Sequence, residues 1–240
     1  MFASFILVAQ DNKNDKPEKS TYRFLPVYDS YGTKLSILKL KDGRTIKGIK
    51  GDLDRKKGQI YSIVMKDTIT KQETEYKADE IAEMYLLPSG LQNVIKVSSA
   101  IDPLVVRNYT DNNLDQVINR GYVYFRNQSV SLKNKKEEKQ YLMQLVNPNF
   151  SVVIQVYGDN MAKETGGIGV MGVKVSGGLD KSYYVSKAGE VFWLKKSEFD
   201  DNYLRLFGDS EAFLAKYPLK KREWEDLNLY VYEYTRMTVK

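Results

Sequence analysis

The local feature of this sequence that could bind a small anion is a glycine-rich segment. Six of the 16 glycines lie within residues 166–178. A glycine-rich loop cradles phosphate with its backbone N–H groups when a helix follows it, whereas the YYV run at residues 183–185 is typical of a strand. We therefore expect a hairpin or loop without a nucleotide. Lys163, Thr165 and Lys181 are the side chains best placed to bind an anionic ligand there.

Pairs of carboxylates are the residues from which acid/base catalysis would have to be built. They occur at residues 137–138, 200–201 and 225–226. Adjacent residues on a helix point about 100° apart, so such a pair does not form an acid/base couple by itself. Asp52 and Asp54 have the alternate spacing of calcium ligands, but their loop lacks the remaining oxygen ligands and the bidentate Glu. The sequence therefore assigns no catalytic residue and no metal ligand.

The chain of 240 residues contains no cysteine and no histidine. The lack of cysteine excludes disulfides, thiolate nucleophiles and thiolate-bound metals. The lack of histidine removes the only side chain that titrates near neutral pH when unperturbed, and with it Ser-His-Asp triads and His-bound zinc. We expect no cofactor, and a non-enzymatic protein is favoured over an enzyme.

The net charge of +6 is spread along the chain rather than concentrated in one block. Residues 35–87 carry 11 basic and 9 acidic side chains, and residues 88–195 carry 13 and 9. Phosphate binding needs cations clustered on one face, so we expect no nucleic-acid partner. The most basic run, residues 55–57, lies in a predicted turn at residues 51–58. It is interpreted as an exposed loop tip rather than a phosphate clamp.

Five short apolar runs between residues 35 and 87 predict a small closed β-barrel. Asp42-Gly43 separates the first two runs and is a strong hairpin signal, because both positions of such a turn require positive φ. Residues 78–81 fit a single helical turn before the last strand. In strand spacing and in this turn, residues 35–87 resemble the SH3-like and Sm-like small barrels. The Asp-x-hydrophobic-Met-Asn signature with which the Sm family binds uridine is missing, so the resemblance does not imply RNA binding.

A turn at residues 88–90 is the predicted domain boundary. Residues 35–88 form the barrel, and residues 89–240 form an antiparallel-sheet domain with three C-terminal helices, so the fold class is α+β. Ser197 and Asp209 are expected to cap the first two helices. Trp224 is expected to anchor the third helix against the sheet, because its apolar neighbours recur at helical spacing.

The first nine residues, MFASFILVA, are apolar and are followed by a polar stretch. Nine residues cannot span a bilayer, which needs about 20, and no transmembrane segment is predicted. They match the apolar part of a signal peptide, so residues 1–9 are interpreted as a partial signal, with residues 10–34 as a disordered leader and lead-in strand. The alternative is a natural N-terminal strand of a cytosolic protein.

Three sequence stretches within residues 140–235 carry a second resemblance: YLMQLVNPNFS, AKETGGIGVMGVKVSGGLDKSYYV and GEVFWLKKSEFDDNYLRLFGD. With the Trp- and Tyr-rich end of the chain, they resemble uncharacterised exported proteins of Gram-negative bacteria. This resemblance implies export to the periplasm or cell surface, but it implies no activity.

These observations favour an exported, soluble envelope protein that acts as a binding or accessory module for protein or glycan. One alternative is a histidine-free enzyme that uses carboxylates on saccharide or cell-wall material, and a second is Sm-like nucleic-acid binding. A convergent acidic pair facing a cleft would favour the enzyme. An aromatic surface without such a pair would favour binding.

Overall fold

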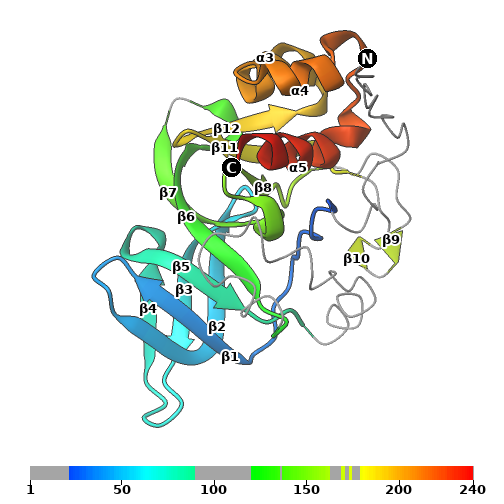
Figure 1. The fold of residues 1–240 in the computed structure, drawn as a ribbon. Coiled ribbons are helices and arrows are strands. Elements are labelled where there is room, and N and C mark those ends of the chain that lie inside the picture. The colour runs from blue at the N-terminus through cyan, green and yellow to red at the C-terminus, as the bar shows by residue number, and fades with distance from the viewer. Residues whose placement is uncertain are drawn as a thin grey trace, which may run out of the picture.

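The computed structural model describes residues 22–89, 120–135, 137–162, 169–170, 173–174 and 179–239. The predicted signal peptide at residues 1–9 and the polar residues 10–20 lie outside this part of the chain. The lead-in strand expected before residue 35 is reduced to a single bridge between Tyr31 and Pro88. Figure 1 shows a barrel in its lower half, with a smaller sheet and the helices above it.

The barrel contains six antiparallel strands. They are β1 (Leu35–Leu40), β2 (Thr45–Lys56), β3 (Gln59–Lys66), β5 (Ile81–Leu86), β6 (Val123–Ser131) and β7 (Glu138–Gln144). Their order is β2-β1-β5-β6-β7-β3, and β3 pairs again with β2, which closes the ring. A further strand, β4 (Glu73–Lys77), pairs with β3 outside the ring. The α+β class is confirmed.

The predicted number of five strands was wrong because the strands before residue 88 do not close a ring by themselves. They leave one edge of β5 and part of one edge of β3 unpaired, and an open edge exposes backbone groups that need partners. β6 covers the edge of β5 in the register Glu83↔Arg126 to Leu86↔Val123. β7 then reaches β3 at the pair Ile60↔Leu142. Two strands of the barrel thus come from beyond the predicted boundary.

The β2–β3 connection is much tighter than the eight-residue turn predicted at residues 51–58. β2 continues to Lys56, and only Lys57 and Gly58, with φ of 47° and 84°, make the turn. Two register shifts within β2 allow this polar stretch to remain a strand, because a bulge accommodates an extra residue. The Asp42-Gly43 hairpin forms as predicted, but only Gly43 takes positive φ.

Alternation of buried and exposed residues along the strands builds the barrel core. In β1 the buried positions are Ser36, Leu38 and Leu40. The interior also contains fully buried side chains from the other strands: Ile63, Ile81, Met84, Leu86 and Leu142.

The second layer is a three-stranded antiparallel sheet of order β12-β11-β8. Its strands are β8 (Ile154–Gly158), β11 (Ser182–Lys187) and β12 (Glu190–Lys195). The predicted C-terminal helices are present as α3 (Phe199–Phe207), α4 (Glu211–Lys216) and α5 (Leu227–Thr238). Figure 1 shows α3 and α4 above the sheet and α5 at the level of β11 and β8. Within the described residues, no helix is both long enough and apolar enough to cross a membrane.

Trp224 occupies the junction of sheet and helices, as predicted. It is 3% exposed, and its indole N–H donates to the carbonyl of Asp180 at 2.9 Å. Its ring stacks on Tyr183 of β11 at 6.0 Å between centroids and meets the edge of Phe199 at 5.5 Å.

Both predicted helix caps were wrong by a small shift in position. Ser197 lies in a short 3₁₀ turn, and α3 begins only after Glu198. The cap of α4 is Ser210, whose side chain accepts a hydrogen bond from the N–H of Phe213. Asp209 instead accepts hydrogen bonds from side chains of other elements, which a local cap rule does not anticipate.

Candidate functional site

An opening in the barrel wall begins where two strands share one edge of β3. β4 pairs with residues 62–66 of that edge, and β7 pairs with it only at Ile60. Tyr61 lies between these two pairings, and 43% of it is exposed. The 3₁₀ turn η1 (Ala78–Glu80) leads away from β4 at the same place. The topology therefore leaves a gap in the wall beside an exposed aromatic ring.

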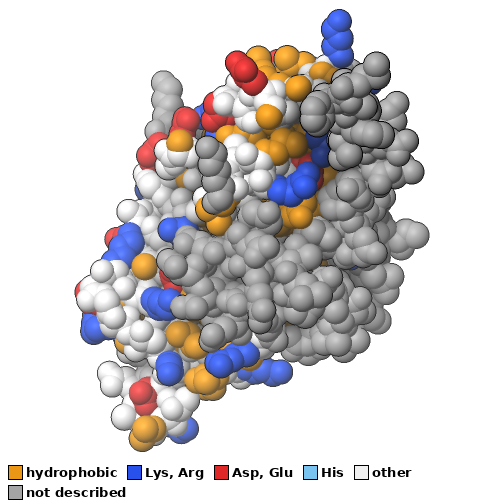
Figure 2. Space-filling model, in the orientation of Figure 1, with side chains coloured by type: hydrophobic (Ala, Val, Ile, Leu, Met, Phe, Trp, Pro, Cys, Tyr) orange, Lys and Arg blue, Asp and Glu red, His pale blue; other side chains and the backbone are white. Residues whose placement is uncertain are grey.

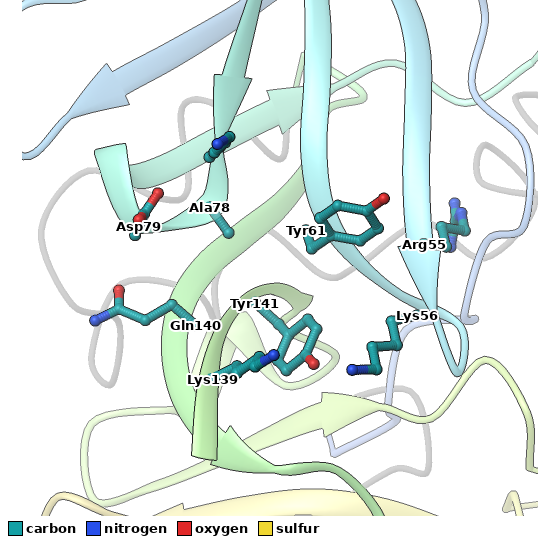
Figure 3. Close-up of a pocket in the computed structure, with 9 residues that line it drawn as sticks. Arg55, Lys56, Tyr61, Ala78, Asp79, Lys139, Gln140 and Tyr141 are labelled. Carbon is teal, nitrogen blue, oxygen red and sulfur yellow. The ribbon is translucent and has the colours of Figure 1, made fainter. Parts of the chain in front are cut away.

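A pocket of about 580 Å³ occupies this gap. Its wall includes two tyrosines and four cationic side chains: Tyr61, Tyr141, Arg55, Lys56, Lys77 and Lys139. Figure 3 shows Tyr61 and Tyr141 on opposite sides of the pocket, with the ends of Lys56 and Lys139 on either side of the Tyr141 ring. We call this the barrel pocket.

The barrel pocket is positively charged. Asp79 is the acidic side chain in its lining. Lys139 pairs with Glu137 at 2.6 Å, whereas Lys56 and Lys77 form no ion pair with any described residue. On the face drawn in Figure 2, Lys and Arg side chains are spread over the barrel, and some of them lie close together near its lower edge. Within the described part of the chain the ammonium groups of Lys56 and Lys77 are therefore not held in an ion pair, although the charge of Lys56 contributes to lowering the pKa of nearby Glu137.

Arg55 has a structural role at the rim of the barrel pocket. Its guanidinium donates to the carbonyls of Gly58 at 2.9 Å and Asp29 at 3.3 Å. It also lies 5.7 Å from the centre of the Tyr31 ring. These contacts hold the end of β2 against the segment that enters the barrel, so Arg55 is less free than Lys56 to meet a ligand.

Uncharged polar groups complete the lining. Gln140 accepts a hydrogen bond from the ammonium of Lys41 through its amide oxygen, which leaves its amide N–H groups to donate. Burial raises the pKa of Tyr141, so its phenol stays protonated at neutral pH and can donate a hydrogen bond. The barrel pocket therefore combines cations, ring faces and hydrogen-bond donors.

No local sequence signal points to the barrel pocket, because its residues come from four separate segments. Residues 55–57 were interpreted as a loop tip, whereas Arg55 and Lys56 end a strand that lines the pocket. Lys77 joins them through the pairing of β4 with β3, in which it lies opposite Ser62, and Lys139 joins them through the closure of the barrel by β7. The count of charges along the chain therefore missed a convergence of cations in space.

Of the three predicted ligand-binding residues, only Lys181 lies in the described part of the chain. Lys163 and Thr165 lie outside the described residues. Lys181 lines a second pocket, of about 1,100 Å³, between the three-stranded sheet and the start of the helices. We call this the sheet pocket. Lys133, Lys195 and Lys196 line it as well.

The glycine-rich segment contains the G-x-G-x-x-G spacing of dinucleotide-binding loops at residues 167–172. That spacing binds pyrophosphate where the loop leads into a helix. Here β9 (Gly169–Val170) pairs antiparallel with β10 (Val173–Lys174). The predicted hairpin is confirmed for these four residues, and they do not open a helix.

A buried carboxylate supports one wall of the sheet pocket. Asp159 is 0% exposed, and one of its oxygens accepts hydrogen bonds from the ammonium of Lys133, the hydroxyl of Ser182 at 2.7 Å and the indole of Trp193 at 2.9 Å. Its other oxygen accepts from the N–H of Met161 at 3.1 Å. Since Asp159 is fully coordinated by donors of the protein, it is a structural centre rather than a free general base.

Two of the three surface carboxylates in the sheet pocket form ion pairs with basic side chains of the protein. Asp200 pairs with Arg222 at 2.6 Å, and Glu225 pairs with Lys196 at 2.5 Å. Glycosidases instead set one carboxylate against another across the scissile bond. Among the described residues, no group of three or more acidic side chains is placed to hold a metal ion. The sheet pocket is therefore better suited to binding than to acid/base chemistry.

Comparisons with known proteins were made with the whole chain. No family model, curated protein or solved structure matches it. The closed six-stranded barrel with its extra strand is compatible with a small SH3-like or Sm-like barrel. The resemblance of residues 140–235 to exported proteins of Gram-negative bacteria stays a prediction. Because small barrels host unrelated functions, the barrel architecture alone does not identify a ligand.

Proposed function

We propose that this chain is an exported, non-enzymatic binding module for an acidic glycan, and that the barrel pocket holds a negatively charged sugar. The single observation that carries the proposal is the position of Lys56 and Lys77. Both ammonium groups line a pocket with two tyrosine rings, and neither forms an ion pair with a described residue. A carboxylate or sulfate of a sugar would form charge-assisted hydrogen bonds with these two ammonium groups.

The remaining groups of the barrel pocket suit a saccharide. Tyr61 presents an exposed ring, and an aromatic face with a few well-placed polar groups is the usual composition of a small-ligand site. Gln140 and Tyr141 offer donors, and Asp79 offers an acceptor for sugar hydroxyls. A binding role is favoured over a carboxylate enzyme because the acidic side chains that could act as acid or base already have partners in the protein. Asp159 is buried and accepts hydrogen bonds, and Asp200 and Glu225 form ion pairs.

Export is part of the proposal and rests on the apolar residues 1–9 and the polar stretch after them. Acidic polysaccharides are components of cell surfaces, so export would bring the pocket to its ligand. Sequencing the N-terminus of protein recovered from native cells tests this part directly. A chain that begins after Ala9 in an extracytoplasmic fraction supports export, and an intact Met1 in the cytoplasm contradicts it.

Affinity electrophoresis through gels containing polygalacturonate tests the ligand class. The native protein should be retarded by polygalacturonate and unaffected by neutral dextran. The double variant Lys56→Gln/Lys77→Gln and the single variant Tyr61→Ala should each bind about tenfold more weakly, a loss equal to about one charge-assisted hydrogen bond. Lys47→Gln/Lys220→Gln, which removes two charges away from the pocket lining, is the matched control and should bind as the native protein does. Equal losses in both double variants would show a nonspecific charge effect and overturn the proposal.

A further inference from the structure

The outer edge of β4 is an exposed row of backbone groups. β4 pairs with β3 on one side, and its other edge pairs with no described strand. At the hairpin that joins β3 to β4, the N–H of Asp67 donates to the carbonyl of Gln72 at 2.9 Å. Bonded and non-bonded pairs alternate in the antiparallel register that follows, so Glu73, Glu75 and Lys77 turn their N–H and C=O groups away from β3.

Side chains cap only part of this edge. The N–H of Lys77 donates to the carboxylate of Glu80 at 2.8 Å. Glu73 and Glu75 are exposed, and their backbone groups at this edge form no hydrogen bond with a described residue. On β12, by contrast, a side-chain amide caps both the N–H and the C=O of Trp193. β4 therefore keeps two residues open to a further strand.

The hairpin holds β4 in an extended conformation before any partner binds. The carboxylate of Asp67 accepts hydrogen bonds from the N–H of Ile69 at 2.8 Å and from the N–H of Thr70 at 2.7 Å. Lys66 of β3 pairs with Glu73 of β4 at 3.2 Å. A strand that is already formed loses less conformational entropy when it binds a partner.

The charge of the edge favours a basic partner strand. Side chains directly opposite each other in an antiparallel pair lie on the same face, with their Cβ atoms about 5 Å apart. Glu75 forms no ion pair with a described residue, so a lysine or arginine opposite it would gain one. An antiparallel register that pairs both Glu73 and Glu75 with the same edge of a second copy puts glutamate opposite glutamate, where like charges repel.

We infer that the free edge of β4 binds an extended basic segment of a partner protein, which adds to the barrel as an antiparallel strand. Main-chain hydrogen bonds to Glu73 and Glu75 supply affinity, and lysine or arginine side chains at alternate positions of the segment supply specificity. Neither glutamate lines the barrel pocket, so this inference does not depend on the proposed binding of an acidic glycan.

A nuclear magnetic resonance titration of the intact protein with a synthetic peptide of alternating lysine and threonine tests this surface. The backbone amide resonances of Glu73 and Glu75 should shift as the peptide binds. Glu75→Lys should bind the peptide about tenfold more weakly, because an attractive cross-strand pair becomes a repulsive one. Glu223→Lys makes the same change of charge at an exposed site beside the helices and should bind as the native protein does.

Two methylated forms of the peptide separate strand addition from simple charge attraction. Antiparallel pairing turns the N–H groups of the lysines opposite Glu73 and Glu75 toward β4, and those of the intervening threonines away from it. N-methylation of the lysines should therefore weaken binding at least about tenfold, whereas N-methylation of the threonines should leave it nearly unchanged.

Three results would overturn the inference. The first is an equal effect of the two methylations, and the second is a set of peptide-induced shifts confined to residues outside β4. The third is a shift of the Glu73 and Glu75 amides that follows protein concentration in the absence of peptide, which would assign the edge to a second copy of the chain.

Discussion

Lys133 and Asp159 form an ion pair in which the lysine side chain is 19% exposed and the carboxylate is fully buried. Lys133 also lies 4.3 Å from the centre of the Trp193 ring, whose indole N–H donates to the same carboxylate. Asp159 therefore joins the 3₁₀ turn η3 (Leu132–Asn134) to β11 and β12 through one oxygen atom, since the hydroxyl of Ser182 in β11 donates to the same oxygen. This centre ties the segment after β7 and the loop after β8 to the three-stranded sheet.

Replacing one partner of this pair should destabilise the protein strongly. Lys133→Met leaves the buried carboxylate without its counter-charge, and we expect a loss of about 3 kcal/mol in the free energy of unfolding. Lys181→Met removes a charge from the same pocket without breaking an ion pair, and it should change stability by less than about 0.5 kcal/mol. Urea denaturation of both variants measures the difference. Equal stabilities would show that Asp159 is not a structural centre.

Trp224 should contribute strongly to the packing of the helices on the sheet. Trp224→Ala removes a buried ring that contacts Tyr183 and Phe199, and it should cost roughly 3–5 kcal/mol. Leu204→Ala, at a position of α3 that is 50% exposed, is the matched control and should cost far less. Thermal unfolding followed by circular dichroism checks both. An unchanged melting temperature in Trp224→Ala would contradict the packing described here.

The buried tyrosines predict a loss of stability at alkaline pH. Burial raises the pKa of Tyr28 from its ordinary value near 10 to about 12. It raises the pKa values of other buried tyrosines as well, among them Tyr31, Tyr124, Tyr157 and Tyr203. Above about pH 10 the unfolded chain loses these protons while the folded chain keeps them, so stability should fall as pH rises.

A spectrophotometric titration of the phenolate absorbance measures this effect. The exposed tyrosines should titrate first and reversibly, and the buried ones should titrate together with unfolding at higher pH. Circular dichroism recorded on the same samples identifies the unfolding step. Titration of every tyrosine near pH 10 with the fold intact would contradict their burial.

The closure of the barrel predicts how a fragment behaves. A fragment of residues 20–88 lacks β6 and β7, so β5 and part of β3 keep open edges. We expect it to be unfolded or to aggregate, because its strand edges are open and the barrel core lacks Val123, Phe125 and Leu142. Circular dichroism and a urea titration should show no cooperative transition. A cooperatively folded fragment would mean that the first five strands are self-sufficient, as the sequence predicted.

Local signals in the sequence predicted most elements but not how the barrel closes. The turn at Gly43, the helical turn at residues 78–80 and the three C-terminal helices follow from short-range chemistry, and all are present. The turn at Lys57-Gly58 was missed, because Lys at a positive-φ position is unusual and gives no signal. Closure depends on β6 and β7 pairing with strands far away in the chain, which periodicity within one segment does not reveal.

The candidate site was predictable only in fragments for the same reason. Lys181 was singled out beside the glycine-rich segment and does line a pocket. The barrel pocket brings Lys56, Lys77 and Lys139 together across the β3–β7 junction. Each of these lysines is an ordinary surface residue in its own segment. Their convergence is a property of the strand order.

The most direct test of the central claim is a calorimetric comparison of two saccharides that differ only in charge. The intact protein is titrated with an oligogalacturonate and with its carboxyl-reduced counterpart, which has the same rings and no carboxylates. Lys56 and Lys77 line the barrel pocket without an ion pair to a described residue, so under the proposed function the acidic saccharide should bind at least about tenfold more tightly than the reduced one. Lys56→Gln/Lys77→Gln should abolish most of that preference. Equal affinity for the two saccharides, or binding of neither, would contradict the account.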